Sequence, residues 1–581
     1  MVSKKGSLRC LFYFKLSQPP PLSSLNTTQL TMAFEIDHDW EGNLATPTAR
    51  IGEKAKIRLL ILLCAIWVLL GLIGHHPWKP EAESISIIHG LFNHGNVLLL
   101  HANSDQQLSH PPLYYLVAAG FAKLFNGWLS IHDAARLSNA VWMSLTLLLA
   151  GMIGRELWGV GVGRQTTFIL MSCIGLISGT HLLMPAVAGL TGLAMGFYAF
   201  TLAYRRPYRA AGLLAGGIAI SLLSTGLMNA SILIICAGLL PLLFKNWRNQ
   251  TFLTSVKLGV SAGLFVGALW LAALWYWQPE AASLWWQEEI SIHQTNFNYF
   301  LRTLAWFSWP ALPLSLWGLW IYRPSLLNKP KFQLMLLFFS VSLVLLGIAA
   351  NTSETSAYPL LLPLVALASG SVEKLKRGAA GALNWFGLVL FGLLGILIWL
   401  GWIAMSFGWP AKLNERMKFL SGLTDHHINL VALILAIFIS LVWLVTVNAK
   451  RSNRAAVTDW AVGITMAWSL LMSLWLPYLD SAKSYASVSV SLQKNLPKRL
   501  NCINSIGLSS HHQNLLSYHL NKRITSTEWY QLQDCDYLLV RSENRYSEIT
   551  PAKHDWKPIW KGKRPAERHE HFVLYQKNKS P

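Results

Sequence analysis

The sequence has little charge and few acidic residues. Only 13% of its 581 residues are charged, with 27 Asp and Glu against 48 Lys and Arg, whereas 53% are hydrophobic. This balance excludes an ordinary soluble domain, and apolar stretches of about 20 residues recur from Ile57 to Leu476, as in a polytopic membrane protein. The net charge of +21 would indicate a nucleic-acid partner in a soluble chain. Here most Lys and Arg stand in short breaks between apolar stretches, so we interpret them as topology signals and expect no nucleic-acid partner.

Cysteine is also scarce, and no group of residues has the ligand spacing of a tight metal site. Cys502 and Cys535 share the C-terminal segment, and an oxidising compartment would let them form a disulfide that closes a loop of about 34 residues. Two buried thiols are the alternative. The other four cysteines, which we expect to be packing residues or parts of an irregular N-terminal segment, are Cys10, Cys64, Cys173 and Cys236.

The N-terminal segment, residues 1–55, lacks an apolar stretch of signal-peptide length. It is polar and irregular, and it carries three consecutive prolines at 19–21. We expect this segment to be disordered and cytoplasmic, or in part a start-site artefact with Met32 as the true initiator.

Long apolar runs predict a transmembrane domain over 56–478 with about 13 helices. A further run, 111–125, has only about 15 apolar residues, fewer than the roughly 20 that span a bilayer, so we expect a juxtamembrane or re-entrant helix there. The predicted spans are 57–77, 134–157, 166–183, 186–204, 210–226, 228–245, 254–277, 304–322, 331–350, 355–371, 382–405, 428–447 and 455–478.

The positive-inside rule orients these spans. When every cluster of Lys and Arg is placed in the cytoplasm, the first long loop (78–133) and the loops 278–303 and 406–427 face outward. The segment 479–581 then lies on the same outer side. In a bacterium this arrangement describes a multi-pass protein of the inner membrane with a periplasmic C-terminal segment.

The C-terminal segment, 479–581, has the pattern of a small α/β domain. Tyr537–Arg541 and His571–Tyr575 alternate as strands do, and Ser510–Asn521 has the pattern of a helix. The segment is therefore predicted to fold as a periplasmic domain of about 100 residues. Its Lys/Arg-rich end suits an anionic acceptor, and ordinary surface charge is the alternative reading.

Two carboxylates stand just beyond the first apolar run, in the sequence from Trp78 to Glu83. Glu81 and Glu83 have one residue between them, so they cannot share one face of a helix and at most one is expected to point at a reacting centre. A solvated loop, or a cap for a helix that starts near Ser84, is the alternative explanation of these acids.

The first outer loop carries two further motifs, His110-Pro-Pro-Leu-Tyr-Tyr115 and Ala134-Ala-Arg-Leu137. Together with Trp78-Lys-Pro-Glu81, their order resembles the GT-C membrane glycosyltransferases of the aminoarabinose transferase and protein mannosyltransferase kind. The resemblance implies a GT-C fold and transfer of a sugar from a polyprenyl-phosphate carrier to a lipid, glycan or protein acceptor on the outer side. It also implies a divalent metal ion.

The resemblance assigns roles to particular positions. Glu81 stands where that family has its catalytic Asp, and Glu83 substitutes for a family Glu that is replaced by Ala82. His110 follows Ser109 in place of a Glu-Lys pair expected to bind metal and phosphate. The candidate substrate-binding residues are His110, Arg136, Tyr114, Asp105, Glu288 and Glu289.

The altered motif leaves a second functional class open. A catalytically degenerate descendant would bind a polyprenyl lipid or a glycan without transferring a sugar. The changed acids favour this alternative, whereas the loop motifs and the outer domain favour an active transferase.

Overall fold

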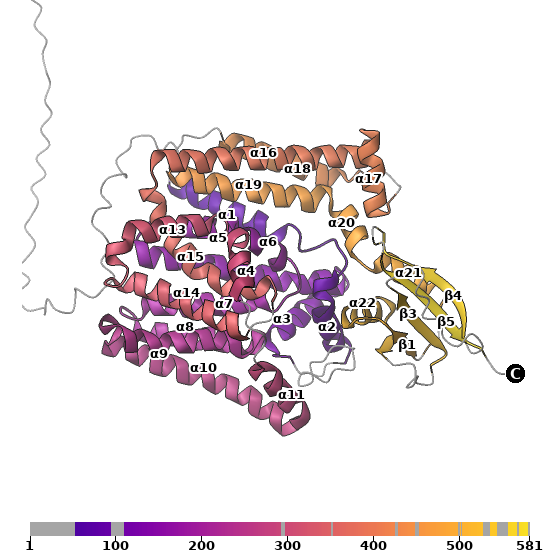
Figure 1. The fold of residues 1–581 in the computed structure, drawn as a ribbon, viewed down its shortest axis with the longest axis horizontal. Coiled ribbons are helices and arrows are strands. Elements are labelled where there is room, and N and C mark those ends of the chain that lie inside the picture. Colours follow the sequence, from indigo (N-terminus) through magenta and orange to yellow (C-terminus); the bar gives the residue numbers. More distant parts are fainter. Residues whose placement is uncertain are drawn as a thin grey trace, which may run out of the picture.

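The computed structural model is mostly helical and carries one small sheet near the C terminus (Figure 1). The predicted N-terminal segment up to residue 52, with Met32, and the candidate Asp105 lie outside the residues that the structure describes. Those are residues 53–94, 110–291, 297–349, 352–423, 428–447, 453–497, 500, 502–526, 535–542, 556–565, 567 and 569–578.

Eight helical segments in the described ranges are long and apolar enough to cross a membrane, which makes the chain a multi-pass membrane protein. These are α4 (Ile131–Trp158), α8 (Pro207–Thr225), α10 (Gln250–Trp277), α14 (Pro330–Ala349), the segment around α15 (Tyr358–Ser371), α16 (Arg377–Phe407), α18 (Leu430–Val447) and α19 (Asn453–Leu474). Shorter apolar helices are α1 (Glu53–Leu69), α3 (Leu113–Leu124), α7 (Ala186–Leu202) and α9 (Leu227–Leu243).

The remaining α-helices connect and cover these segments, together with η2, which is one of five short 3-10 helices in the described ranges. They are η2 (Lys79–Glu81), α2 (Ala82–His94), α5 (Val162–Ser172), α6 (Ile174–Thr180), α11 (Pro279–Ile290), α12 (Phe297–Phe307), α13 (Ala311–Tyr322), α17 (Ala411–Ser421), α20 (Leu476–Lys483), α21 (Ala486–Gln493) and α22 (Ser510–Leu520).

Two stretches predicted as single spans are each divided into two helices. The stretch 166–183 is shared by α5 and α6, because Cys173 between them has an extended backbone with φ −66° and ψ 117°. The stretch 304–322 is shared by α12 and α13, and α13 begins after Pro310, which has no N–H to donate to a preceding turn. Apolar length alone does not reveal such breaks, which depend on the local backbone.

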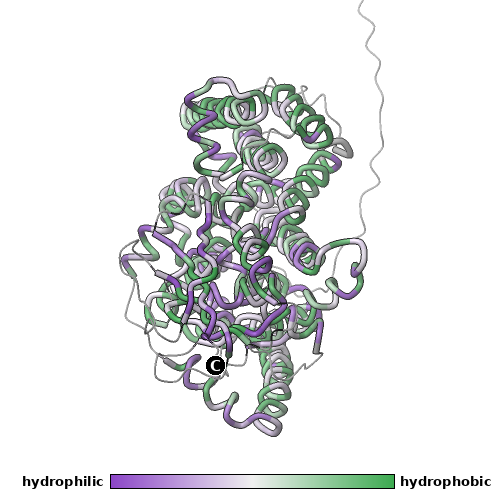
Figure 2. Tube along the Cα trace, turned by 90° about the vertical axis from the view of Figure 1, so that its right-hand side faces the viewer, coloured by the Kyte–Doolittle hydropathy of each residue, from purple (hydrophilic) through white to green (hydrophobic). Residues whose placement is uncertain are grey.

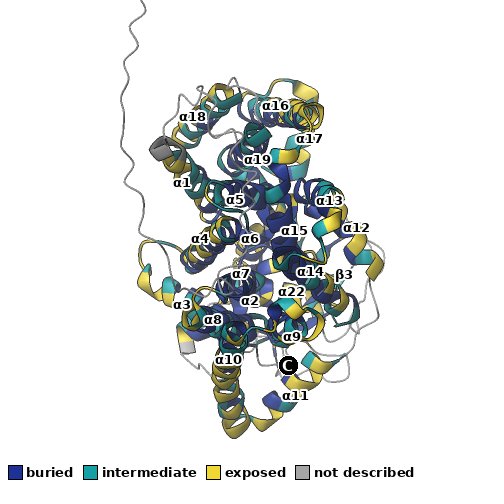
Figure 3. Cartoon of the chain, turned by 90° about the vertical axis from the view of Figure 1, so that its left-hand side faces the viewer, coloured by how far each residue is buried: buried dark blue, intermediate teal, exposed yellow. Residues whose placement is uncertain are grey.

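The helices differ in how far they are buried, as expected for a bundle in lipid (Figure 3). About α15, 83% of the apolar window is buried inside the protein, whereas the values are 22% for α10 and 11% for α18. Figure 2 shows hydrophobic residues along the peripheral helices and hydrophilic residues nearer the centre of the face that carries the C terminus.

The C-terminal sheet has five strands in the order β2-β1-β3-β5-β4. β1 runs parallel to β2 and β3, whereas β5 runs antiparallel to β3 and β4. The two strands expected from the sequence are β3 and β5, and they pair with Leu539 opposite Leu574. The bounds are β1 (Cys502–Ile506), β2 (Arg523–Ser526), β3 (Tyr537–Ser542), β4 (Trp556–Gly562) and β5 (His571–Lys577).

The C-terminal domain rests on the first long loop (78–133), with α22 beside α2 (Figure 1). Asp480 of α20 lies 2.6 Å from His76 Nδ1 and accepts the indole N–H of Trp78 over 3.1 Å. The hydroxyl of Tyr518 in α22 lies 2.8 Å from His132 Nδ1 at the start of α4. These contacts hold the domain directly over the loop that carries the candidate acids.

A disulfide joins Cys502 at the start of β1 to Cys535 just before β3, with 5.6 Å between their Cα atoms and a sequence separation of 33. We expect replacement of both cysteines by Ala to destabilise the domain by about 3 to 4 kcal/mol, because the unfolded chain regains the entropy of the opened loop. Limited proteolysis of the full-length protein should then cleave the domain faster. Dithiothreitol should accelerate cleavage of the wild type and leave the double variant unchanged; equal rates for the two proteins without reductant would contradict the prediction.

Candidate active site

A buried ion pair between Glu81 and Arg136 anchors the first long loop. Glu81 ends η2, Arg136 lies in the second turn of α4, and both side chains are fully buried. Arg136 Nε donates to Glu81 Oε1 over 2.7 Å and Nη2 donates to Oε2 over 2.9 Å. This is the bidentate geometry in which a guanidinium and a carboxylate bind each other most strongly.

Further hydrogen bonds satisfy both partners. The backbone N–H groups of Trp78 and Leu183 donate to Glu81 over 2.9 and 3.0 Å, and Arg136 donates to the carbonyl of His75 over 2.7 Å. Burial opposes ionisation of Glu81, but the charge of Arg136 and the hydrogen bonds outweigh it and hold the pKa of Glu81 below its ordinary value. Each Glu81 oxygen therefore already accepts two donors.

A cavity of about 320 Å³ brings three other candidates together: Glu83, His110 and Glu289. Glu83 Oε1 lies 3.2 Å from His110 Nε2, and Glu289 accepts the backbone N–H of Leu227 over 2.8 Å. The hydrogen bond from His110 lowers the pKa of Glu83, whereas burial raises the pKa of Glu289. We call this space the carboxylate cavity, because its described lining includes two Glu and no Lys or Arg.

The other sequence-predicted candidates lie outside this lining. Tyr114 is buried, and its hydroxyl donates to Asn139 over 3.0 Å, so it supports the bundle; the neighbouring Tyr115 lines the cavity instead. Glu288 is exposed on α11. Glu81 and Arg136 line neither this cavity nor the larger one beside it.

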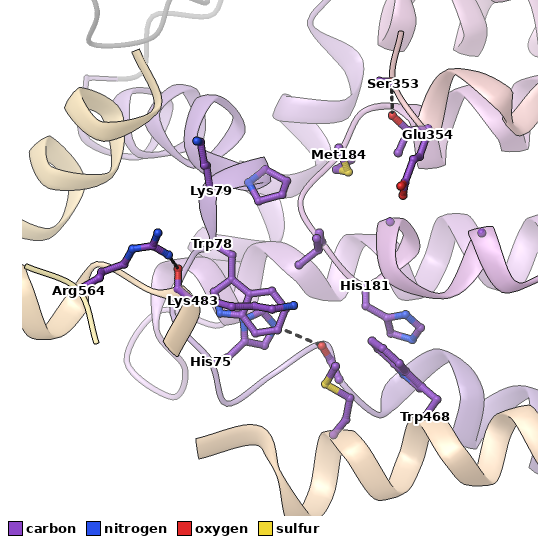
Figure 4. A pocket seen from close by; sticks show the side chains of 17 residues that line it. His75, Trp78, Lys79, His181, Met184, Ser353, Glu354, Trp468, Lys483 and Arg564 are labelled. Atoms are coloured by element: carbon purple, nitrogen blue, oxygen red, sulfur yellow. Dashed lines mark hydrogen bonds between the residues drawn. The ribbon is translucent and has the colours of Figure 1, made fainter. Parts of the chain in front are cut away.

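The larger cavity, of about 500 Å³, has a cationic wall. Figure 4 shows Lys79, Lys483 and Arg564 on one side of it and Glu354 on the other. The two cavities adjoin, since Pro80 and Met184 line both. We call the larger space the cation cavity.

The cationic wall combines residues of the first long loop and of the C-terminal domain. Lys79 belongs to η2, Lys483 ends α20, and Arg564 follows β4. The ammonium of Lys483 lies 4.5 Å from the centre of the Trp78 ring, and desolvation lowers the pKa of this lysine. An anion that entered the cavity would place an opposite charge beside Lys483.

Sequence reasoning missed the cation cavity. Lys79 stands inside the motif Trp78-Lys-Pro-Glu81, which is a signal that the resemblance left unused. Lys483, Arg564 and Glu354 are far from that motif in sequence, so only the fold brings them together.

The described residues do not provide a metal centre. Among them, no three His, Cys, Asp or Glu side chains are grouped so that they could hold an ion. The described donors therefore do not form a site that fits the divalent ion implied by the resemblance.

Solved structures with a similar fold were found. The crystal structure of ArnT from Cupriavidus metallidurans bound to undecaprenyl phosphate matches with a TM-score of 0.65 at 15% sequence identity, covering 90% of this chain and 98% of that one. Its apo state matches with the same values. The chain has a GT-C fold. This fold confirms the architecture predicted from the order of the loop motifs, with the small C-terminal sheet.

A further solved structure gives a weaker match. The archaeal oligosaccharyltransferase AglB from Archaeoglobus fulgidus, in complex with an inhibitory peptide and a dolichol-phosphate, matches with a TM-score of 0.42 at 9% identity, covering 84% of this chain and 69% of that one. No protein-family model and no curated protein matches the sequence.

The buried ion pair predicts a large stability effect. Glu81→Ala would remove the bidentate partner of the buried Arg136 and leave it one carboxylate contact, Asp133 Oδ1 at 3.1 Å. We therefore expect a loss of about 3 kcal/mol, measured as a lower Tm of the purified protein in lipid. The exposed Glu280 of α11 provides the matched control, since Glu280→Ala should leave Tm nearly unchanged. If both variants had the Tm of the wild type, Arg136 would not depend on Glu81 for its place in the fold.

Proposed function

We propose that the protein is a glycosyltransferase that moves a sugar from a polyprenyl-phosphate carrier to an acceptor on the outer side of a membrane. The observation that carries this proposal is the cation cavity, where three positive side chains lie beside the first outer loop of a GT-C fold. The ArnT structure with undecaprenyl phosphate supports a carrier of the same chemical class for this chain. The acceptor is a lipid, a glycan or a protein.

The cation cavity is suited to the phosphate of the carrier. Lys79 and Lys483 supply ammonium donors and Arg564 supplies a planar guanidinium, the two cation types that bind phosphate in proteins. Trp78 and Trp468 form apolar walls beside them, and charge interactions are stronger where water is excluded. The same cations would stabilise the negative charge that develops on the phosphate when the carrier leaves.

The adjoining carboxylate cavity is suited to the sugar and the acceptor hydroxyl. We assign Glu83 as the general base, because its side chain is 52% exposed and lines this cavity. The acceptor oxygen forms a bond to the anomeric carbon as its proton passes to Glu83. The bond from that carbon to the phosphate oxygen breaks, and the polyprenyl phosphate leaves with the electron pair.

Glu81 is assigned a supporting role in this mechanism. Both of its oxygens accept two donors, and its side chain is fully buried in the pair with Arg136. A carboxylate with a lowered pKa and four donors is a weak base for an acceptor that it does not face. Arg136 is assigned to the same structural pair instead of a phosphate contact.

The proposed setting is the inner membrane of a bacterium, with the sheet domain in the periplasm. The domain supplies Arg564 to the same cavity as Lys79 of the first outer loop, so both must lie on one side of the membrane. The disulfide between Cys502 and Cys535 supports an oxidising compartment for that side.

The direct test is release of free polyprenyl phosphate from a panel of polyprenyl-phosphate sugars by the purified protein in lipid. Glu83→Gln should lower kcat by at least about 100-fold, because it removes the base. Lys79→Ala should raise KM about tenfold or more, because it removes a charged contact to the phosphate. Glu280→Gln and Lys561→Ala, at exposed positions outside both cavities, should retain the wild-type rate.

If the wild type binds the carrier but releases no polyprenyl phosphate, the transferase hypothesis is rejected. The alternative, a protein that binds a polyprenyl lipid without transferring a sugar, would then hold. Full activity of Glu83→Gln would reject Glu83 as the base while leaving the transferase in place. The two outcomes separate the reaction from the assignment of its base.

The partner of Glu83 predicts a pH effect. His110 lowers the pKa of Glu83 below its usual value of 4.5. The base therefore stays ionised at pH 4.5, and the transfer rate falls only at a lower pH. His110→Ala leaves burial to raise this pKa, so the acid limb of the profile of kcat/KM against pH should move to higher pH. His569→Ala, at an exposed position, should not move it. An unmoved limb in His110→Ala would show that Glu83 is not the titrating base.

A further inference from the structure

Arg564 reaches the cation cavity from the C-terminal domain, where several groups fix its guanidinium. Its Nε lies 3.2 Å from Glu570 Oε2, and its Nη2 lies 3.2 Å from Glu567 Oε2. The guanidinium carbon also lies 4.6 Å from the centre of the Tyr485 ring. A long side chain with this many partners keeps few of its rotamers.

Glu570 differs from Glu567 in its burial. The Glu570 side chain is 7% exposed, whereas that of Glu567 is 36% exposed. The hydroxyl of Tyr485 donates to both Glu570 oxygens over 3.1 and 2.9 Å, and His512 Nε2 lies 2.7 Å from Oε1. A buried carboxylate held in this way is a fixed support for a cation.

The support continues into the body of the domain. Ser509, the residue before α22, places its hydroxyl 2.6 Å from His512 Nδ1. Arg541 of β3 lies 3.6 Å from Glu570 Oε1, so a second cation faces the same carboxylate. Burial opposes ionisation of Glu570, but the hydrogen bond and charge of His512, with its other partners, bring its pKa to about 2. The group therefore carries its negative charge throughout the neutral range.

We propose that Glu570 is a positioning residue for the cation cavity: it holds the Arg564 guanidinium against the cavity wall, so that the C-terminal domain completes the binding site for a phosphate-bearing lipid. The proposal rests on the proposed function for the identity of the lipid, and on the contacts above for the role of Glu570. Glu570 itself does not line the cavity, so it acts through Arg564.

Removal of the Glu570 carboxylate would strengthen anion binding if only its charge mattered, and would weaken binding if it positions Arg564. These opposite expectations make the proposal testable. Loss of a negative charge near an anion site favours anion binding by Coulomb's law. Loss of a positioning group weakens binding, because the Arg564 side chain is then mobile in the free protein. Ordering it when the anion binds costs conformational entropy and reduces the binding free energy. The sign of the change in Kd distinguishes the two effects.

The experiment measures Kd of the full-length protein in lipid nanodiscs for a fluorescent polyprenyl phosphate that carries no sugar. We expect Arg564→Ala and Glu570→Gln each to raise Kd about tenfold, the size of one charged hydrogen-bond contact. Glu567→Gln is the matched control. It removes the same charge from the same arginine at a more exposed site, and its Kd should change less than about threefold.

A double variant separates positioning from general destabilisation. If Glu570 acts only through Arg564, Arg564→Ala with Glu570→Gln should have the Kd of Arg564→Ala alone. Tyr485→Phe, which keeps the ring under Arg564 and removes a hydrogen bond to Glu570, should raise Kd about twofold to threefold and covers the case in which Glu570→Gln does not fold.

Unchanged or tighter binding by folded Glu570→Gln, or by Tyr485→Phe where Glu570→Gln does not fold, would overturn the proposal. Additive losses in the double variant would do the same. Absence of polyprenyl phosphate binding by the wild type would overturn it as well. Binding that weakens as expected in a protein that releases no polyprenyl phosphate from any sugar donor would reject the transferase and leave the role of Glu570 in place.

Discussion

The arrangement of the face that carries both cavities depends on the buried pair of Glu81 and Arg136. This pair ties two separate stretches of backbone to the start of α4: the stretch from His75 to Trp78, and the stretch at Leu183. Two buried charges are costly to desolvate, and the cost is offset here because every oxygen of Glu81 has donors. The pair fixes η2, and with it Lys79 toward one cavity and Glu83 toward the other.

The fixed loop separates opposite charges into adjoining spaces. The cation cavity and the carboxylate cavity share Pro80 and Met184, so a phosphate in the first lies close to whatever occupies the second. A polyprenyl-phosphate sugar also has two chemically different parts, a charged phosphate that suits the cation cavity and a hydroxylated sugar that suits the carboxylate cavity. The C-terminal domain contributes to only one of the two sides, through Lys483 on its connecting helix and through Arg564.

The sequence predicted the GT-C architecture from several loop motifs. Each motif alone is weak evidence for this fold, but their fixed order along the chain is strong evidence. It also predicted Glu83, His110 and Glu289 as candidate site residues, and these three line one cavity. It did not reveal that Glu81 and Arg136 are partners, because they are 55 residues apart and each had a separate role by resemblance.

Positions far apart in sequence limited what could be predicted. Arg564 and Lys79 meet only after the sheet domain has packed on the first loop, and no local pattern encodes that contact. The breaks at Cys173 and Pro310 were missed for a different reason, since hydropathy averages over a window and does not detect a single non-helical residue. The structure therefore adds most to the sequence analysis where segments that are far apart in the chain come into contact.

The length of α16 has a consequence for the lipid around the protein. Its 31 residues extend over about 46 Å, more than the roughly 30 Å of a bilayer core, whereas α18 with 18 residues is close to a match. Beyond α16, α17 ends at Ser421, whose carbonyl accepts the hydroxyl of Ser481 in α20 over 2.7 Å. A change in membrane thickness alters the tilt of a long helix. The bond between Ser421 and Ser481 thus joins the helix that follows α16 to the helix that ends at Lys483, and so connects the longest helix of the bundle to the cation cavity.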